Sequence, residues 1–136
     1  MTTMHSPFQG IWSYRSFCNN PDLNVEFNDL RFGAGILEIS EPSLGVVAGT
    51  IGGPGWLLTL KGWLTYGNPS TIRFQGSGEI DGEPWIYDYL GYLAPAWPNG
   101  IDQRAAIIGT IVRTIAHSNG QSPAGYVASW IAVRQD

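Results

Sequence analysis

Residues 71–90 read TIRFQGSGEIDGEPWIYDYL, and this stretch decides the fold class. Apolar and polar side chains alternate on both sides of Asp81-Gly82, which is typical of β-strands that turn one face toward a core. An Asp-Gly pair favours a two-residue type I′ turn, because both central residues of that turn have positive φ. The stretch therefore predicts an antiparallel hairpin whose register is set by the turn.

The turn also predicts which side chains share a face. Counting away from it pairs Ile80 with Glu83, Gly78 with Trp85, Gly76 with Tyr87, Phe74 with Tyr89 and Ile72 with Gly91. The intervening residues of the first strand are mostly polar: Thr71, Arg73, Gln75, Ser77 and Glu79. Because that polar face belongs in water, Phe74, Trp85, Tyr87 and Tyr89 are expected to point into the core, with glycines opposite the large rings.

Similar alternation along the rest of the chain predicts a barrel. Strands are expected at 8–17, 29–40, 45–52, 56–66, 70–80, 84–94, 104–117 and 125–134. No helical pattern is long enough to cross over a parallel sheet, so neighbouring strands pair antiparallel. We therefore predict an all-β chain that forms one eight-stranded antiparallel up-and-down β-barrel over 1–136, with a flexible segment at 1–7. A change of apolar phase at Gly33 and Gly35 predicts a bulge or bend there.

The opposite face of 84–94 is too apolar for a surface in water. It holds Ile86, Leu90 and Tyr92, and the strands expected at 104–117 and 125–134 carry apolar side chains on both faces. Strands of this kind favour burial on both sides. We therefore expect a homodimer or homotetramer built on these three strands, with Ile86, Leu90, Tyr92, Ile107 and Ile111 in the contact.

Charge and hydropathy argue against two classes of partner. With 7 Lys and Arg against 11 Asp and Glu, the net charge is −4, which does not suit a surface that tracks phosphates. We expect no nucleic-acid partner. No apolar run approaches the roughly 18 residues of a spanning helix, so no membrane partner is expected either. The first residues lack the charged and apolar regions of a secretory leader, and a cytoplasmic location is the expectation.

Cysteine and histidine are too few for the common metal sites. Cys18 is the single cysteine, which excludes an internal disulfide, and His5 and His117 are the two histidines. The acidic residues show no spacing typical of metal ligands. Gly33-Ala-Gly35 lies inside a strand pattern, whereas a phosphate-binding loop needs a following helix. We therefore expect neither a metal nor a cofactor.

Gly10-Ile11-Trp12 opens the first expected strand, and Arg134 lies in the last. With these residues the chain resembles the calycin superfamily, whose lipocalin and avidin branches are antiparallel barrels. The resemblance implies that Trp12 fills the closed end and that Arg134 stacks on its ring. The length and the lack of a C-terminal helix bring the chain nearer to the avidin-like branch. The biotin-binding positions of that branch fall on Tyr14, Ser16 and Cys18, and only Ser16 matches, so biotin is not the expected ligand.

A ligand would enter such a barrel at the end opposite Trp12. Aromatic walls with a few polar tips are typical of small-molecule pockets. The candidate ligand-binding residues are Tyr14, Phe74, Trp85, Tyr87, Tyr89, Arg113, His117, Tyr126 and Trp130. An eight-stranded barrel can equally be filled by its own side chains, which would leave no cavity.

Two of these candidates have structural alternatives. Arg113 faces the cavity if the odd-numbered residues of 104–117 point inward, and an anionic ligand would then follow. An interfacial ion pair with Asp88 is the alternative. His117 is either a general acid or base at the mouth or a residue at a solvated strand end.

Three functions fit the sequence. The preferred one is an oligomeric barrel that binds a small hydrophobic or aromatic molecule. A second is a cofactor-free enzyme of the cyclase or isomerase type, in which a Tyr hydroxyl, Arg113 or His117 stabilises developing charge. A third is a protein-interaction module that acts through its apolar outer face.

Overall fold

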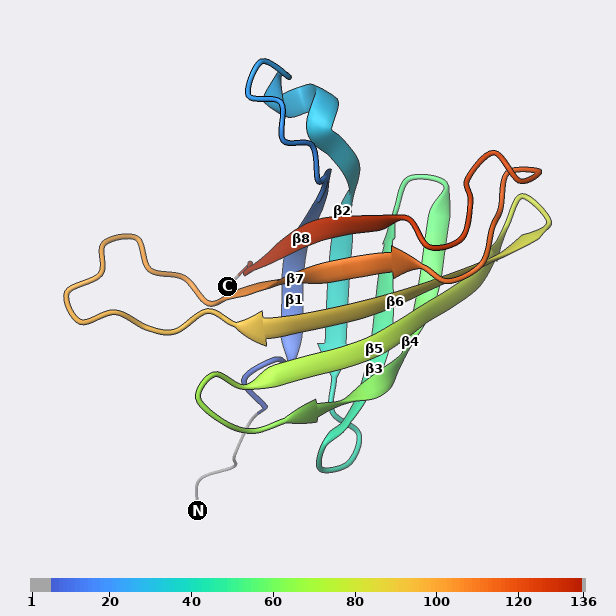
Figure 1. Ribbon diagram of the computed structural model, residues 1–136. Helices are drawn as coiled ribbons and strands as arrows, with labels where there is room; N and C mark the ends of the chain where they lie inside the picture. The colour runs from blue at the N-terminus through green and yellow to red at the C-terminus, as the bar shows by residue number, and fades with distance from the viewer. Residues whose placement is uncertain (1–5, 136) are drawn as a thin grey trace.

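Eight strands follow one another in the computed structural model, which describes residues 6–135 (Figure 1). They are β1 (Gly10–Cys18), β2 (Arg31–Ser40), β3 (Val46–Gly53), β4 (Trp56–Thr65), β5 (Thr71–Ile80), β6 (Glu83–Leu93), β7 (Ala106–Arg113) and β8 (Val127–Arg134). A 3₁₀ turn, η1 (Phe27–Leu30), precedes β2. Each strand pairs antiparallel with its sequence neighbours, and β8 pairs with β1. This confirms the predicted all-β, eight-stranded antiparallel barrel. Within residues 6–135 no helix is long and apolar enough to cross a membrane.

The β5–β6 hairpin has the register that its sequence predicts. Ile80 pairs with Glu83, Gly78 with Trp85, Gly76 with Tyr87, Phe74 with Tyr89 and Ile72 with Gly91. Asp81 and Gly82 have φ values of 51° and 79°, as a type I′ turn requires. The turn therefore fixes which rings of β6 enter the barrel.

The bulge predicted near Gly33 and Gly35 occurs at Phe32. Ser16 pairs with Gly33 and Phe17 pairs with Arg31, so Phe32 is the extra residue of β2. A bulge changes which face of the barrel a side chain points to. Phe32 accordingly packs against the buried core, with its ring centroid 6.3 Å from that of Tyr87.

β7 is shorter than predicted. The sequence predicts a strand over 104–117, but β7 ends at Arg113. Beyond it the chain forms a loop in which His117 and Ser122 pair through their backbones, at N–O distances of 3.0 and 3.2 Å. Ser118 and Asn119 turn the chain in the left-handed region, with φ values of 56° and 57°. The Gly125 N–H donates to the Arg113 carbonyl at 2.7 Å and closes the loop there, so the ladder with β8 ends at Arg113.

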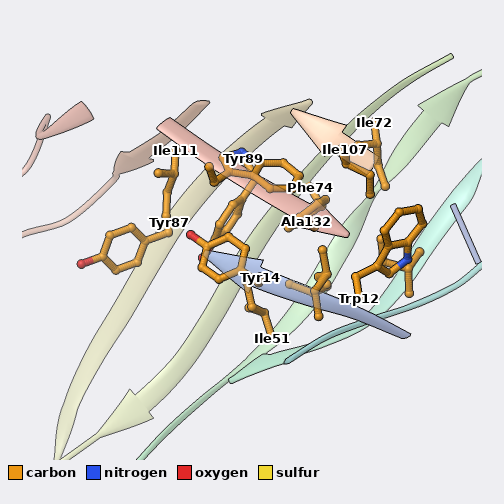
Figure 2. Packing of buried hydrophobic residues seen from close by; sticks show 14 of the residues in the cluster. Trp12, Tyr14, Ile51, Ile72, Phe74, Tyr87, Tyr89, Ile107, Ile111 and Ala132 are labelled. Atoms are coloured by element: carbon orange, nitrogen blue, oxygen red, sulfur yellow. The ribbon is translucent and has the colours of Figure 1, made fainter. Parts of the chain in front are cut away.

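The half of the barrel below the mouth is filled with side chains. Figure 2 shows Tyr87 at one end of the row and Trp12 at the other, with Tyr14, Tyr89 and Phe74 between them. The rings of Phe74 and Tyr89 stack with centroids 4.7 Å apart. Gly91 makes room for a third ring, because a Cβ there would lie 2.8 Å from the Trp130 indole. The lower half is therefore a packed core.

The closed end is built around Trp12, which is fully buried. Its Nε1 donates to the Phe8 carbonyl at 2.9 Å, and the Arg134 guanidinium lies 4.4 Å from the centroid of its ring. Arg134 also donates to the carbonyls of Gln9 at 2.7 Å and Pro7 at 2.6 Å. The expected stacking of Arg134 on Trp12 is confirmed. Of the predicted flexible segment 1–7, residues 1–5 lie outside the described residues, whereas Pro7 is hydrogen-bonded.

Two of the five residues expected in the subunit contact do not lie on the outer face of β6 and β7. Ile86, Leu90 and Tyr92 pair with the outward residues of β5, and Leu90 and Tyr92 are exposed. Ile107 and Ile111 are buried inside the barrel, with 0% and 4% of their surfaces exposed. The odd-numbered residues of β7 point inward, so the placement of these two isoleucines in a subunit contact is wrong.

Self-association through this outer face stays a prediction. We expect Leu90→Lys to lower the mass of the particle in solution to that of one chain, because a buried ammonium at a contact costs desolvation energy. Size-exclusion chromatography with light scattering measures that mass. Leu57→Lys, at an exposed position on β4, is the matched control and should leave the mass unchanged. A wild-type protein that is already monomeric would contradict the prediction.

Candidate functional site

A cavity of about 390 Å³ opens at the end of the barrel opposite Trp12. The connections that follow β1, β3, β5 and β7 lie at this end, away from the start of β1 and the end of β8 (Figure 1). Its lining is Tyr14, Ser16, Phe32, Gly33, Trp56, Leu58, Trp85, Tyr87, Tyr89, Ile111, Arg113, His117, Ser118 and Ser122. Pockets for small molecules have this size and this mainly aromatic character.

Six of the nine predicted site residues line this cavity: Tyr14, Trp85, Tyr87, Tyr89, Arg113 and His117. Phe74 and Trp130 instead belong to the packed core, where their ring centroids lie 6.1 Å apart. Tyr126 stacks on Phe32 with centroids 5.4 Å apart and stands beside the Arg113 guanidinium. These three residues therefore support the cavity without lining it.

Several lining residues were not among the sequence candidates. Trp56 and Leu58 lie in the inward phase of β4, so alternation alone could have identified them. Phe32 reaches the cavity through the β2 bulge, which the apolar phase change indicates only in outline. Ser118 and Ser122 depend on the fold of the loop after β7, for which the sequence carries no comparable signal.

Arg113, Tyr87 and His117 form a hydrogen-bonded chain in the cavity wall. Arg113 Nε donates to the Tyr87 hydroxyl at 2.9 Å, and that hydroxyl lies 2.7 Å from His117 Nε2. His117 Nδ1 is 2.9 Å from Ser118 Oγ. All bonds are satisfied together when Tyr87 donates to Nε2 and Nδ1–H donates to Ser118. The chain thereby fixes the orientation of three polar groups at the mouth.

The loop after β7 holds this chain in place. Arg113 N–H donates to the Tyr126 carbonyl at 2.9 Å, which keeps the two ends of the loop together. The Glu83 carboxylate accepts the backbone N–H groups of Ser118 and Asn119 at 3.1 and 3.2 Å. Glu83 thus satisfies two amides that the left-handed turn points away from the sheet. The position of His117 follows from these contacts.

Three aromatic rings surround the Arg113 guanidinium. Its central carbon lies 5.5 Å from the ring centroid of Phe32, 5.6 Å from that of Tyr87 and 5.3 Å from that of Tyr126. Nη1 donates to the Pro123 carbonyl at 3.1 Å. Cation–π contacts of this kind offset part of the cost of burying the charge. Arg113 is consequently fixed inside the barrel wall with only 8% of its surface exposed.

His117 is a neutral imidazole at neutral pH. Burial lowers its pKa below the ordinary value, and the positive charge of Arg113 lowers it further, while Glu83 opposes the shift. Its ring stacks on Trp85 with centroids 3.9 Å apart and planes 12° apart. Burial likewise raises the pKa of Tyr14 and of Tyr89, so both phenols stay protonated. The cavity wall therefore presents one cation and several neutral hydrogen-bonding groups.

The chain was compared with known proteins by sequence and by structure. No family model, no curated protein and no solved structure matches it. In the part of the chain that the structure describes, no three His, Cys, Asp or Glu side chains are grouped so as to hold a metal ion. The site is therefore interpreted from its own geometry.

The lowered pKa of His117 makes stability depend on pH. We expect the free energy of unfolding to decrease as pH falls below about 6.5, the ordinary pKa of histidine. Between that value and the lower folded-state pKa, the unfolded chain binds more protons at His117, so acid favours unfolding. Urea unfolding at a series of pH values from 7.5 to 5 measures this.

His117→Gln tests the assignment, because glutamine does not titrate. Arg113, Tyr87 and Glu83 face the imidazole and remain in this variant. We expect a smaller decrease of stability between pH 7 and pH 5.5 than in the wild type. The same decrease in both proteins would mean that other groups carry the pH dependence.

Proposed function

We propose that this barrel binds a small aromatic or apolar molecule in the cavity at its mouth. The observation that carries the proposal is a concave wall of Trp56, Trp85, Phe32 and other rings, interrupted by a few polar tips. Rings provide most of the contact area in such sites, and isolated polar groups orient the ligand. The packed core under Tyr14 and Tyr89 gives the cavity a floor.

The fold supports the same proposal. A barrel of eight strands has just enough interior for side chains or for one small ligand. Here the rings of the core occupy the closed end, and the space remains at the mouth. The barrel and the Trp12–Arg134 contact support a calycin-like architecture of the avidin-like type, in which Trp12 fills the closed end and the opposite end is left for a ligand.

Two probes of similar shape test whether the cavity binds ligands. 2-Naphthamide is neutral and 2-naphthoate is anionic, and binding of either should change the fluorescence of Trp85 and Trp56. We expect a saturable change with at least one of them. Native mass spectrometry of the protein purified from its host provides a second measurement, because a bound small molecule adds mass.

Filling the cavity should abolish this binding. Ser16 lines the cavity on the inward face of β1 and is fully buried, so Ser16→Leu places a larger side chain in the ligand volume. We expect at least a tenfold loss of affinity, about 1.4 kcal/mol. Ser13→Leu, on the same strand with its side chain on the other face, is the matched control. Equal affinities in the two variants would place the binding site elsewhere.

The hydrogen-bonded chain supports a second candidate function, that of a cofactor-free enzyme. Tyr87 lies between a guanidinium and a neutral imidazole, so its hydroxyl proton can pass to His117 Nε2 while Arg113 stabilises the phenolate, which can then take a proton from a bound molecule. Mass spectrometry of a bound molecule after incubation tests this idea. A chemical change that Tyr87→Phe slows at unchanged affinity supports catalysis, whereas recovery of the molecule unchanged supports binding alone.

A further inference from the structure

We infer that the ligand of the mouth cavity is an aromatic carboxylate and that Arg113 binds its carboxylate group. This inference rests on the proposed function and names the chemical class of the ligand.

Arg113 has donors left over for a ligand. A guanidinium carries five N–H groups, and the hydrogen bonds of Arg113 use one on Nε and one on Nη1. Nη2 makes no hydrogen bond with residues 6–135. Within these residues, no fully buried side-chain nitrogen or oxygen lacks a partner, so Nη2 keeps some accessible surface. Arg113 is one of the residues that line the cavity, and this nitrogen is therefore available to a ligand bound there.

The guanidinium of Arg113 is buried, and neither of the groups that accept its hydrogen bonds is a carboxylate. Both of its acceptors, the Tyr87 hydroxyl and the Pro123 carbonyl, are neutral. The neighbouring strand β6 has two acidic residues. Glu83 uses its two oxygens for the amides of Ser118 and Asn119, and Asp88 accepts hydrogen bonds from Gln75 and Thr114. Burial of a cation without an anion is unfavourable, and an anionic ligand would supply the missing charge. One negatively charged group of a ligand could therefore pair with Arg113 in the free protein.

The rest of the lining favours a carboxylate over a phosphate. Phosphate groups are usually bound by clusters of Arg or by several charged donors. His117 adds no second positive charge, because burial and Arg113 lower its pKa. The hydroxyls of Ser118 and Ser122 add neutral donors at the rim. One guanidinium with neutral donors matches a single carboxylate, which Arg can bind through two parallel hydrogen bonds.

The cavity size limits the body of the ligand. At about 30 Å³ for each water molecule, 390 Å³ corresponds to roughly a dozen waters. A bicyclic aromatic acid has about that many non-hydrogen atoms. The rings of Trp85 and Phe32 line the cavity and provide apolar surface against which such a body can pack.

The experiment compares an acid with its own amide on the intact protein. Titration of 2-naphthoate and 2-naphthamide into the wild type gives two dissociation constants for ligands of nearly equal shape. We expect the carboxylate to bind at least about tenfold more tightly, because a hydrogen bond between two charged groups is about twice as strong as a neutral one. High salt should weaken the binding of 2-naphthoate and leave the binding of 2-naphthamide unchanged.

Variants identify the group responsible for the difference. Arg113→Gln should remove the preference for the acid, and Arg113→Lys should keep part of it. Arg73→Gln, on the outward face of β5, is the matched control and should keep all of it. Thermal unfolding of each variant checks that the barrel is intact.

The outcomes separate the inference from the function beneath it. Tighter binding of 2-naphthoate that depends on Arg113 supports the inference. Equal binding of acid and amide overturns the inference and leaves the proposed function standing. Binding of neither probe, together with no co-purified molecule, overturns the proposed function and the inference with it.

Discussion

Replacing Trp12 with alanine is expected to lower the free energy of unfolding by about 3–5 kcal/mol and to leave the affinity of the mouth cavity nearly unchanged. The indole is fully buried at the closed end, where its Nε1 bonds to the Phe8 carbonyl and its ring lies under Arg134. Alanine would leave a void there and remove the surface on which Arg134 stacks. The cavity lies at the other end, beyond the rings of the core.

Denaturant unfolding and ligand titration of the same variant test this separation. Arg134→Ala should show a smaller loss of stability in the same direction, because it removes the cation–π contact and the bonds to the carbonyls of Gln9 and Pro7. Trp97→Ala removes an indole that is 72% exposed and is the control, with an expected change within about 0.5 kcal/mol. If folded Trp12→Ala lost much of its affinity for the ligand, the closed end and the mouth cavity would not be independent.

Much of the fold could be predicted because local chemistry determines it. Asp81-Gly82 permits the two positive φ values of a tight turn, and the period of two then places Phe74, Trp85 and Tyr89 on one face. Closure by β1 and β8 is a tertiary contact, and the positions of Trp12 and Arg134 indicated it through their resemblance to a family pattern. The positions of the strands and the side chains that point inward can thus be predicted from residues close together in the sequence.

The candidate site was predictable only as far as alternation extends. Tyr14, Tyr87 and Tyr89 point inward by position in their strands, and the structure brings them together. The direction of Arg113 stayed open, because the long connection between β6 and β7 does not set the register of β7. His117 reaches Tyr87 through a loop whose left-handed turn depends on Glu83, a residue distant in sequence. Contacts of this kind depend on the assembled barrel.

Phe74 is buried in the core and does not line the cavity. Phe74→Ala is expected to cost about 3–5 kcal/mol of stability, because its ring is buried and packs against Tyr89 and Trp130. Phe27→Ala, which truncates a phenylalanine that is 86% exposed, should change stability by less than about 0.5 kcal/mol.

The same change should alter which ligands fit. The space left by Phe74 adjoins the ring of Tyr89, which lines the cavity, so a shift of that ring into the space would deepen the floor. We expect biphenyl-4-carboxylate, a longer acid, to gain affinity relative to 2-naphthoate in Phe74→Ala, as titration of both acids into both proteins would measure. An empty apolar space of this kind can accept a ring in place of the one removed. The loss of stability shows that the Phe74 ring has been removed from a packed core. If the ratio of the two affinities is nevertheless unchanged, the space next to Tyr89 is not continuous with the site, and Phe74 does not limit the length of the ligand.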